Sequence, residues 1–319
     1  MKLKCAILDD YQNVAMKMAD WSVVADKVEV TVFHQHMDKE DDVVRAIQDF
    51  DIVVIMRERT PFRATIFERL DKLKLLITSG MRNASIDLAA ASAKGVVVCG
   101  TASYSEPPTE LAWSLILGLA RGLVQENHSI RNNGPWQQTI GKDLYGSTLG
   151  LLGLGKIGGR MARIAQAFGM KVIAWSQNLT LEQAEAAGVQ LASSKEELLM
   201  SSDFVSIHLV LSERTRGLIG PAELQLMRPT SYLINTSRAQ IVDQAALVEA
   251  LQKGKIAGAG IDVFETEPLP ENDILRKLPN VLATPHLGYV TLRNYQTYYR
   301  EAVEDIVTFL KGSPIRKLS

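Results

Sequence analysis

The stretch from Leu149 to Asn178 constrains the fold more than any other part of the chain, because it reads as strand, glycine turn, helix and strand. Apolar residues 149–154 are typical of a strand buried on both faces of a parallel sheet. A helical pattern then ends at Gly169, and residues 171–175 predict the next strand. The apolar face predicted for this helix consists of Ile157, Met161, Ile164, Ala165 and Phe168.

Three glycines in this stretch, Gly153, Gly155 and Gly158, have the G-x-G-x-x-G spacing. In this setting the first permits a tight turn, the second lets a pyrophosphate approach closely, and the third allows close packing of helix on strand. The phosphates would bind at the positive end of the helix. A glycine motif alone often only ends a strand, but here the strands and the helix are in register with it. The stretch therefore predicts a dinucleotide-binding domain.

The end of the second strand departs from the usual pattern. An acid there normally hydrogen-bonds the ribose 2′-OH of NAD, whereas this strand ends at Trp175 and continues with Ser176, Gln177 and Asn178. Without a carboxylate, nothing repels the 2′-phosphate of NADP, yet no Arg or Lys follows to bind one. We expect NAD(P) as cofactor, with a slight preference for NADP that rests on Ser176.

Chain length, net charge and cysteine content suit two domains and exclude several classes of function. A chain of 319 residues is long for a single core. A net charge of −1 offers no basic field for nucleic acid. Cys5 and Cys99 are the only cysteines and have no metal-ligand spacing, which favours a reducing compartment without a metal site. No apolar run suggests a signal peptide or a membrane span, so we expect a cytoplasmic protein.

The pattern along the chain is α/β, with apolar strands alternating with helices. We predict a smaller, flavodoxin-like substrate domain of residues 1–101 plus 287–319, and a Rossmann dinucleotide-binding domain of residues 102–286, both with parallel sheets. The first hundred residues contain five expected strands, at 5–8, 28–33, 52–56, 73–78 and 96–98. A long helix at 292–310 would return the chain to the first domain.

The second domain is expected to contain six strands, the number of a full dinucleotide fold. After the two strands of the opening stretch, these fall at 204–208, 232–235, 258–262 and 281–283. Pro107 and Pro108 fit only the first turn of a helix that leads into the domain. An irregular arm is expected from His128 to Ser147; its Trp136 would pack on a partner subunit or on its own domain.

Two strand ends in the first domain carry candidate substrate residues. Arg57 follows the third strand, where a guanidinium could face a substrate anion, although a solvated charged loop explains it equally well. Ser79, Gly80 and Met81 follow the fourth strand, and their backbone N–H groups could receive a carboxylate. A plain turn is the alternative for this loop.

Three strand ends in the second domain carry ionisable residues that a plain fold does not require. These are Arg238, the acids Asp262 and Glu267, and His286. Taken singly, each has an ordinary explanation as a surface charge, a solvated turn or a structural histidine. Because all follow strands at one edge of a parallel sheet, where ligands bind, we consider them together as a catalytic site.

With these motifs in place, the chain resembles the D-isomer-specific 2-hydroxyacid dehydrogenase family, in particular glyoxylate/hydroxypyruvate reductases and phosphoglycerate dehydrogenases. The resemblance covers nearly the whole length. It rests on LGLLGLGKIGGRMA at 149–162, FVSIHLVLSERTRGLIG at 204–220, LINTSRAQIVD at 233–243, GIDVFETEPL at 260–269 and TPHLG at 284–288. It implies hydride transfer between NAD(P)H and a small 2-keto acid or D-2-hydroxy acid, by a homodimer joined through its cofactor domains.

The resemblance also implies a role for each candidate. Arg238 would bind the substrate carboxylate and carbonyl, and His286 would be the acid/base that Glu267 orients. Asp262 would hold the nicotinamide carboxamide, and Ser79, Gly80 and Met81 would receive the substrate carboxylate. The remaining cofactor contacts implied are Lys156, Ile157, Ser176, His208, Thr215, Thr236 and Gly288.

The chain departs from the family at two further positions: Arg82 stands where many members have glycine, and Val210 where many have proline. Arg82 suggests a second anionic group on the substrate or a pairing with an acid. Formate dehydrogenases typically have glutamine at Glu267, which argues against that branch. Two alternatives are a dinucleotide-sensing regulator like the co-repressors of the superfamily, and a phosphonate or amino-acid oxidoreductase. Neutral charge and the lack of appended tails weigh against the regulator.

Overall fold

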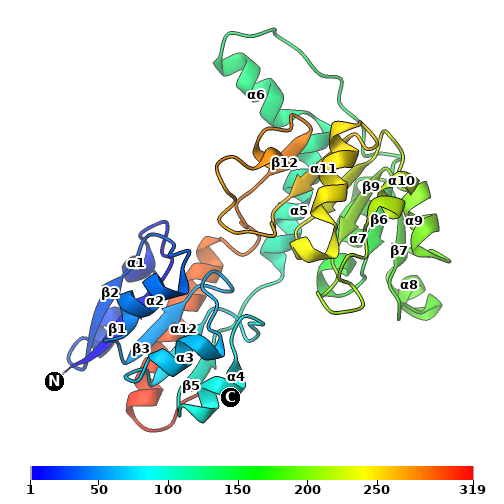
Figure 1. Ribbon diagram of the computed structural model, residues 1–319. Helices are drawn as coiled ribbons and strands as arrows, with labels where there is room; N and C mark the ends of the chain where they lie inside the picture. The colour runs from blue at the N-terminus through cyan, green and yellow to red at the C-terminus, as the bar shows by residue number, and fades with distance from the viewer. Residues whose placement is uncertain (1, 319) are drawn as a thin grey trace. The chain divides into compact units, whose positions relative to one another are not determined.

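A computed structural model describes residues 2–318 (Figure 1). The chain divides into two compact units. The first unit comprises the described residues up to Tyr104 together with those from Val290 onward, and the second unit is Ser105–Tyr289. Both boundaries come three residues after the positions expected from the sequence.

The first unit contains a parallel sheet of five strands in the order β2-β1-β3-β4-β5, which is the flavodoxin-like order. All residues of β3 and β4 are buried, as expected for central strands covered on both faces. The strands are β1 (Leu3–Ile7), β2 (Val28–Val32), β3 (Ile52–Ile55), β4 (Leu75–Thr78) and β5 (Val97–Gly100).

The longest helix of this unit is α12 (Leu292–Leu310), which confirms the helix predicted at 292–310. Its buried side includes Tyr295, Tyr298 and Ile306. The shorter helices are α1 (Ala15–Met18), η1 (Trp21–Val24), α2 (Glu40–Ile47), α3 (Ala64–Arg69) and α4 (Leu88–Ala93).

The second unit contains a parallel sheet of seven strands, so the six expected strands were one too few. The order is β12-β11-β10-β9-β6-β7-β8, and the missed strand is β8, which has only two residues and therefore no periodic signal. The strands are β6 (Thr148–Leu152), β7 (Lys171–Trp175), β8 (Gln190–Leu191), β9 (Phe204–Ile207), β10 (Tyr232–Asn235), β11 (Gly258–Ile261) and β12 (Val281–Ala283). Strands β6 to β11 have the order of a Rossmann fold, and β12 is an added strand at the edge.

Helices α5 (Glu106–Ala120) and α7 (Lys156–Ala167) pack on this sheet, and Pro107 and Pro108 lie in the first turn of α5 as predicted. On the face predicted for α7, Met161 and Ala165 are buried, whereas Ile164 and Phe168 are only partly buried, at 36% and 39% exposed. The other helices are α6 (Leu123–Arg131), α8 (Leu181–Ala186), α9 (Lys195–Ser201), α10 (Pro221–Leu226), η2 (Ala239–Ile241), α11 (Gln244–Gln252) and η3 (Ile274–Arg276).

The arm expected from His128 is irregular only after Arg131, because α6 includes His128. Figure 1 shows α6 and the segment after it projecting from the rest of the second unit. Trp136, Ile140 and Tyr145 in this segment are among the most exposed apolar side chains. Among residues 2–318, no helix is both long enough and apolar enough to cross a bilayer.

Candidate active site

The glycine turn after β6 requires glycine at two of its three glycine positions, Gly153 and Gly158. Gly153 has φ +102°, and a Cβ there would lie 2.7 Å from the backbone oxygen of His208. A Cβ on Gly158 would lie 2.1 Å from the backbone oxygen of Gly153, so α7 packs on the strand only because this position has no side chain. Gly155 is different, because a Cβ there would meet no described atom within 4 Å.

This open space at Gly155 lies directly before the first turn of α7, where unpaired N–H groups and the helix dipole favour an anion. Lys156 is the first residue of the helix and is exposed, and Ile157 follows it partly buried. The turn thus has the space, the N–H donors and the charge that a pyrophosphate needs. The residues present fit a dinucleotide.

A cavity of about 290 Å³ lies at the carboxyl end of β7. Two of the predicted cofactor residues, Ser176 and Thr215, line it. The Thr215 hydroxyl also accepts a hydrogen bond from Ser212 N (2.8 Å) and donates one to Val210 O (2.8 Å), so it holds the loop after β9 in a tight turn.

His208 follows β9 and lies against the glycine turn, with its backbone N–H donating to Leu152 O (2.8 Å). Its Nε2 lies 2.9 Å from the Ser206 hydroxyl. Burial of the ring lowers the pKa of His208 to about 4, because the cation loses its hydration there. His208 is therefore neutral near pH 7.

Arg238 is presented by a turn that Asn235 builds at the end of β10. The Asn235 side chain accepts a hydrogen bond from Ser237 N (3.0 Å) and donates one to Arg238 O (3.0 Å). The Arg238 guanidinium donates to Ser237 O (2.8 Å) and is partly exposed. Thr236 lies in the same turn, also partly exposed. Asn235 was not among the residues predicted from the sequence, although an asparagine at the end of a strand is a signal for such a turn.

The structure pairs His286 with Glu267. His286 Nδ1 lies 2.6 Å from Glu267 Oε2, and the other carboxylate oxygen accepts a hydrogen bond from Phe264 N (2.8 Å). The side chains of His286 and Glu267 are 22% and 32% exposed, so the pair is fixed yet accessible. Because a carboxylate only accepts, Nδ1 carries the proton of this bond and Nε2 is left for other partners.

Asp262 holds the backbone on which His286 is mounted. Its carboxylate accepts hydrogen bonds from Leu287 N (2.7 Å), Gly288 N (2.9 Å) and the Thr284 hydroxyl (2.6 Å). His286 itself has φ +52°, a conformation that non-glycine residues rarely adopt. Burial raises the pKa of the fully buried Asp262, and these hydrogen bonds oppose that shift. The loop therefore maintains an unusual backbone conformation at the imidazole.

Arg238, Asp262 and His286 follow β10, β11 and β12, which are neighbouring parallel strands. All three residues consequently lie at the carboxyl edge of one sheet, where open α/β folds bind ligands. All the residues predicted to contact the cofactor lie in the same unit.

The comparisons with known proteins agree with this geometry. Residues 113–288 match the family described as D-isomer specific 2-hydroxyacid dehydrogenase, NAD binding domain. The chain belongs to the D-isomer-specific 2-hydroxyacid dehydrogenase family. It is thus an oxidoreductase that transfers a hydride between a nicotinamide dinucleotide and a keto or hydroxy acid.

Similar members of the family come from several organisms. The chain is 35% identical to a glyoxylate reductase of Korarchaeum cryptofilum over 277 residues, 85% of this chain and 82% of the relative. It is 36% identical to a hydroxypyruvate reductase of Thermotoga maritima over 290 residues, 89% and 92% of the two chains. A solved structure of phosphoglycerate oxidoreductase from Vibrio cholerae has 37% identity and a TM-score of 0.92, covering 98% of this chain and 100% of that one.

The loop that the sequence predicts to bind substrate lies in the first unit. Ser79, Gly80 and Met81 follow β4, and Gly80 has φ +91°. A Cβ on Gly80 would lie 2.1 Å from Arg57 Nη1, so the glycine makes room for the guanidinium beside the loop. Arg57 Nη1 lies 3.4 Å from Ser79 O, and Arg57 itself has φ +54°. Arg82 is exposed.

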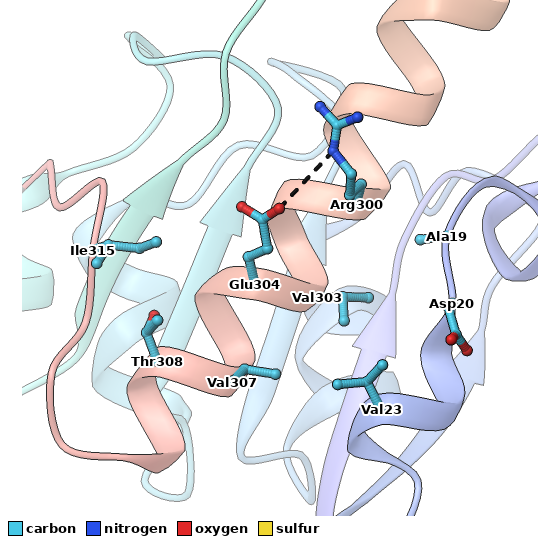
Figure 2. A pocket seen from close by; sticks show the side chains of 9 residues that line it. All are labelled: Ala19, Asp20, Val23, Arg300, Val303, Glu304, Val307, Thr308 and Ile315. Atoms are coloured by element: carbon cyan, nitrogen blue, oxygen red, sulfur yellow. Dashed lines mark ion pairs between the residues drawn. The ribbon is translucent and has the colours of Figure 1, made fainter.

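The first unit also has a larger cavity, of about 390 Å³, which none of the predicted substrate residues lines (Figure 2). It lies between α12 and η1, with Val23, Val303 and Val307 on its walls and Arg300 3.9 Å from Glu304 at its rim. Most of its surface is apolar and none of the predicted substrate residues lines it, so size alone does not mark the active site.

Proposed function

We propose that this enzyme reduces a small 2-keto acid to the D-2-hydroxy acid, or catalyses the reverse reaction, with Arg238, Glu267 and His286 as its catalytic residues. The observation that carries the proposal is the 2.6 Å contact between His286 Nδ1 and Glu267 Oε2. Bound NAD(P)H supplies the hydride. The protein must then supply a proton, a binding site for the carboxylate and a dry surrounding.

His286 is the proton donor in this proposal. Glu267 occupies Nδ1, so the proton passes between Nε2 and the substrate oxygen. In the reduction, the carbonyl carbon accepts the hydride and the oxygen accepts the proton from Nε2. In the oxidation, the imidazole takes the hydroxyl proton instead. The Asp262 network fixes the ring's backbone, which limits the positions that Nε2 can reach.

Arg238 is the proposed partner of the substrate carboxylate and carbonyl, since a guanidinium presents paired donors in a fixed plane. Ser79, Gly80, Met81 and Arg57 stay proposed substrate residues, supported by the space that Gly80 leaves for the Arg57 guanidinium. Asp262 stays a proposed contact of the nicotinamide carboxamide, in addition to its bonds within the His286 loop.

The proposed cofactor is NAD(P), with a slight preference for NADP because Ser176 stands where an acid would exclude a 2′-phosphate. We also propose a cytoplasmic homodimer joined through the cofactor units. The exposed apolar side chains of α6 and the following segment support that interface, notably Ile130, Trp136 and Ile140. Light scattering coupled to gel filtration tests the dimer.

Turnover on a panel of keto acids tests the reaction. Purified protein is mixed with glyoxylate, hydroxypyruvate or pyruvate and either NADH or NADPH, and loss of the reduced nicotinamide is followed by absorbance. We expect consumption on at least one keto acid, with a product of D configuration. Binding of the dinucleotide without turnover on any substrate would contradict the proposal and favour a dinucleotide sensor.

A further inference from the structure

The cavity at the carboxyl end of β7 adjoins the glycine turn. Gly153 N donates to Trp175 O (2.9 Å), and a Cβ on Gly153 would lie 3.1 Å from the Leu209 side chain. Trp175 and Leu209 both line the cavity. A dinucleotide whose pyrophosphate lies at Gly155 would therefore extend its adenosine half toward this cavity.

The residues that line the cavity include one positive charge and no negative charge. Its lining includes the apolar Trp175 and Leu209, the neutral polar residues Ser176, Gln177 and Asn178, and Arg214. Arg214 is the one charged residue in this set, and no carboxylate is present in it. Ser176, Gln177 and Asn178 add neutral hydrogen-bond donors beside the cation. A cation with neutral donors and no carboxylate suits a bound anion better than a ribose hydroxyl, which an acid usually binds.

Arg214 reaches the cavity through the turn that Thr215 holds. The Thr215 hydroxyl joins Ser212 N and Val210 O, at 2.8 Å each, which fixes the backbone on both sides of the arginine. The Arg214 side chain is exposed, and within residues 2–318 it forms no ion pair. Its charge is therefore available to a ligand.

We propose that Arg214, together with Ser176, Gln177 and Asn178, binds the 2′-phosphate of the dinucleotide and makes NADP(H) the preferred cofactor. This inference rests on the proposed function, because it needs the adenosine half of a dinucleotide in this cavity. A phosphate monoester carries close to two negative charges and three acceptor oxygens, which the guanidinium and the neighbouring hydroxyl and amides satisfy. The cation comes from the loop after β9, not from the end of β7.

Equilibrium binding of two nucleotides tests the inference without catalysis. Isothermal titration calorimetry on the full chain compares adenosine 2′,5′-bisphosphate with adenosine 5′-monophosphate. The variant is Arg214→Gln, and the matched control is Arg216→Gln, an exposed arginine two residues on that does not line the cavity. We expect Arg214→Gln to weaken the bisphosphate by about 10- to 100-fold, the range of a charge-assisted hydrogen bond. Binding of the monophosphate should change less than about twofold, and Arg216→Gln should change neither.

Four results would overturn the inference. The wild-type protein could bind both nucleotides equally or bind neither, and Arg214→Gln could weaken both equally or weaken neither. Hydride transfer from NADH to a keto acid by the wild-type enzyme is measured separately. That activity upholds the proposed function even when Arg214 has no part in choosing the cofactor.

Discussion

Glu267 and His286 are 19 residues apart in the chain, and 2.6 Å separates Glu267 Oε2 from His286 Nδ1. Glu267 lies in the loop after β11 and His286 in the loop after β12, so pairing of these parallel strands brings the two side chains together. The second carboxylate oxygen is fixed by Phe264 N. Both carboxylate oxygens of Glu267 are thus held, which orients the imidazole as an acid–base group must be oriented to meet a substrate.

The first prediction concerns the two residues assigned to the substrate. His286→Ala and Arg238→Ala should each lower kcat/KM by about 10²- to 10⁴-fold, because one loses the proton donor and the other the carboxylate partner. Binding of NAD(P)H, measured by fluorescence titration, should survive in both. Intact turnover in both variants would refute the assignment.

Glu267→Gln keeps an acceptor for Phe264 N but removes the negative charge beside His286. We expect kcat to fall on the order of 10- to 100-fold, less than on loss of the imidazole itself, with the Kd of NAD(P)H unchanged. Glu265→Gln is the matched control, since Glu265 is an exposed acid in the same loop. Steady-state kinetics check this, and an equal loss in both variants would show a general effect on the loop.

Adjacent glycines in α7 should respond oppositely to alanine. Gly158→Ala places a Cβ 2.1 Å from the Gly153 carbonyl oxygen and should destabilise the protein by about 1–3 kcal/mol. Gly159→Ala meets no described atom within 4 Å and should stabilise the helix by up to about 1 kcal/mol. Urea unfolding measures both. Similar changes in the two variants would mean that the close packing at Gly158 is not what the turn requires.

Ser176→Asp tests the account of the end of β7. A carboxylate there hydrogen-bonds a ribose 2′-OH and repels a 2′-phosphate, so the ratio of kcat/KM for NADPH to that for NADH should fall on the order of tenfold or more. Initial rates with each nicotinamide give the ratio. An unchanged ratio would show that this residue does not face the ribose.

Asp305 predicts a pH dependence of stability. It is fully buried on α12, and burial raises its pKa to about 7 despite the Arg316 guanidinium, whose Nε lies 3.0 Å from Asp305 Oδ1. The unfolded carboxyl has a pKa of about 3.9. Between these values the folded state binds more protons than the unfolded state, so this residue makes stability fall as pH rises from about 4 to about 7.

Thermal unfolding of the wild-type protein and of Asp305→Asn over that pH range measures the effect. The Tm of the wild-type protein should decline by a few degrees relative to the variant, which cannot ionise. Glu304→Gln, an exposed neighbour that also contacts Arg316, serves as the control. Parallel curves for wild type and Asp305→Asn would show that the carboxyl does not titrate there.

Much of the fold could be predicted because local sequence patterns indicate it. The strand at 171–175, the helix at 292–310 and the glycine turn each depend on residues within one or two turns of chain, where apolar periodicity and glycine spacing are direct signals. The flavodoxin-like and Rossmann sheets followed from alternation of such elements. Elements without a period were missed or misplaced, namely β8 and the end of α6.

The family, the order of the elements and the residue types that follow each strand could all be inferred from the residues alone. Which of those residues meet depends on the fold: Glu267 contacts His286, Asp262 binds the backbone of Leu287 and Gly288, and Arg214 lines the cavity beside Ser176. Periodicity is set by neighbours along the chain, whereas these contacts are set by strand pairing and loop turns that join distant segments. No Arg or Lys directly follows β7 in the sequence, but the fold places Arg214, from the loop after β9, in the same cavity as Ser176.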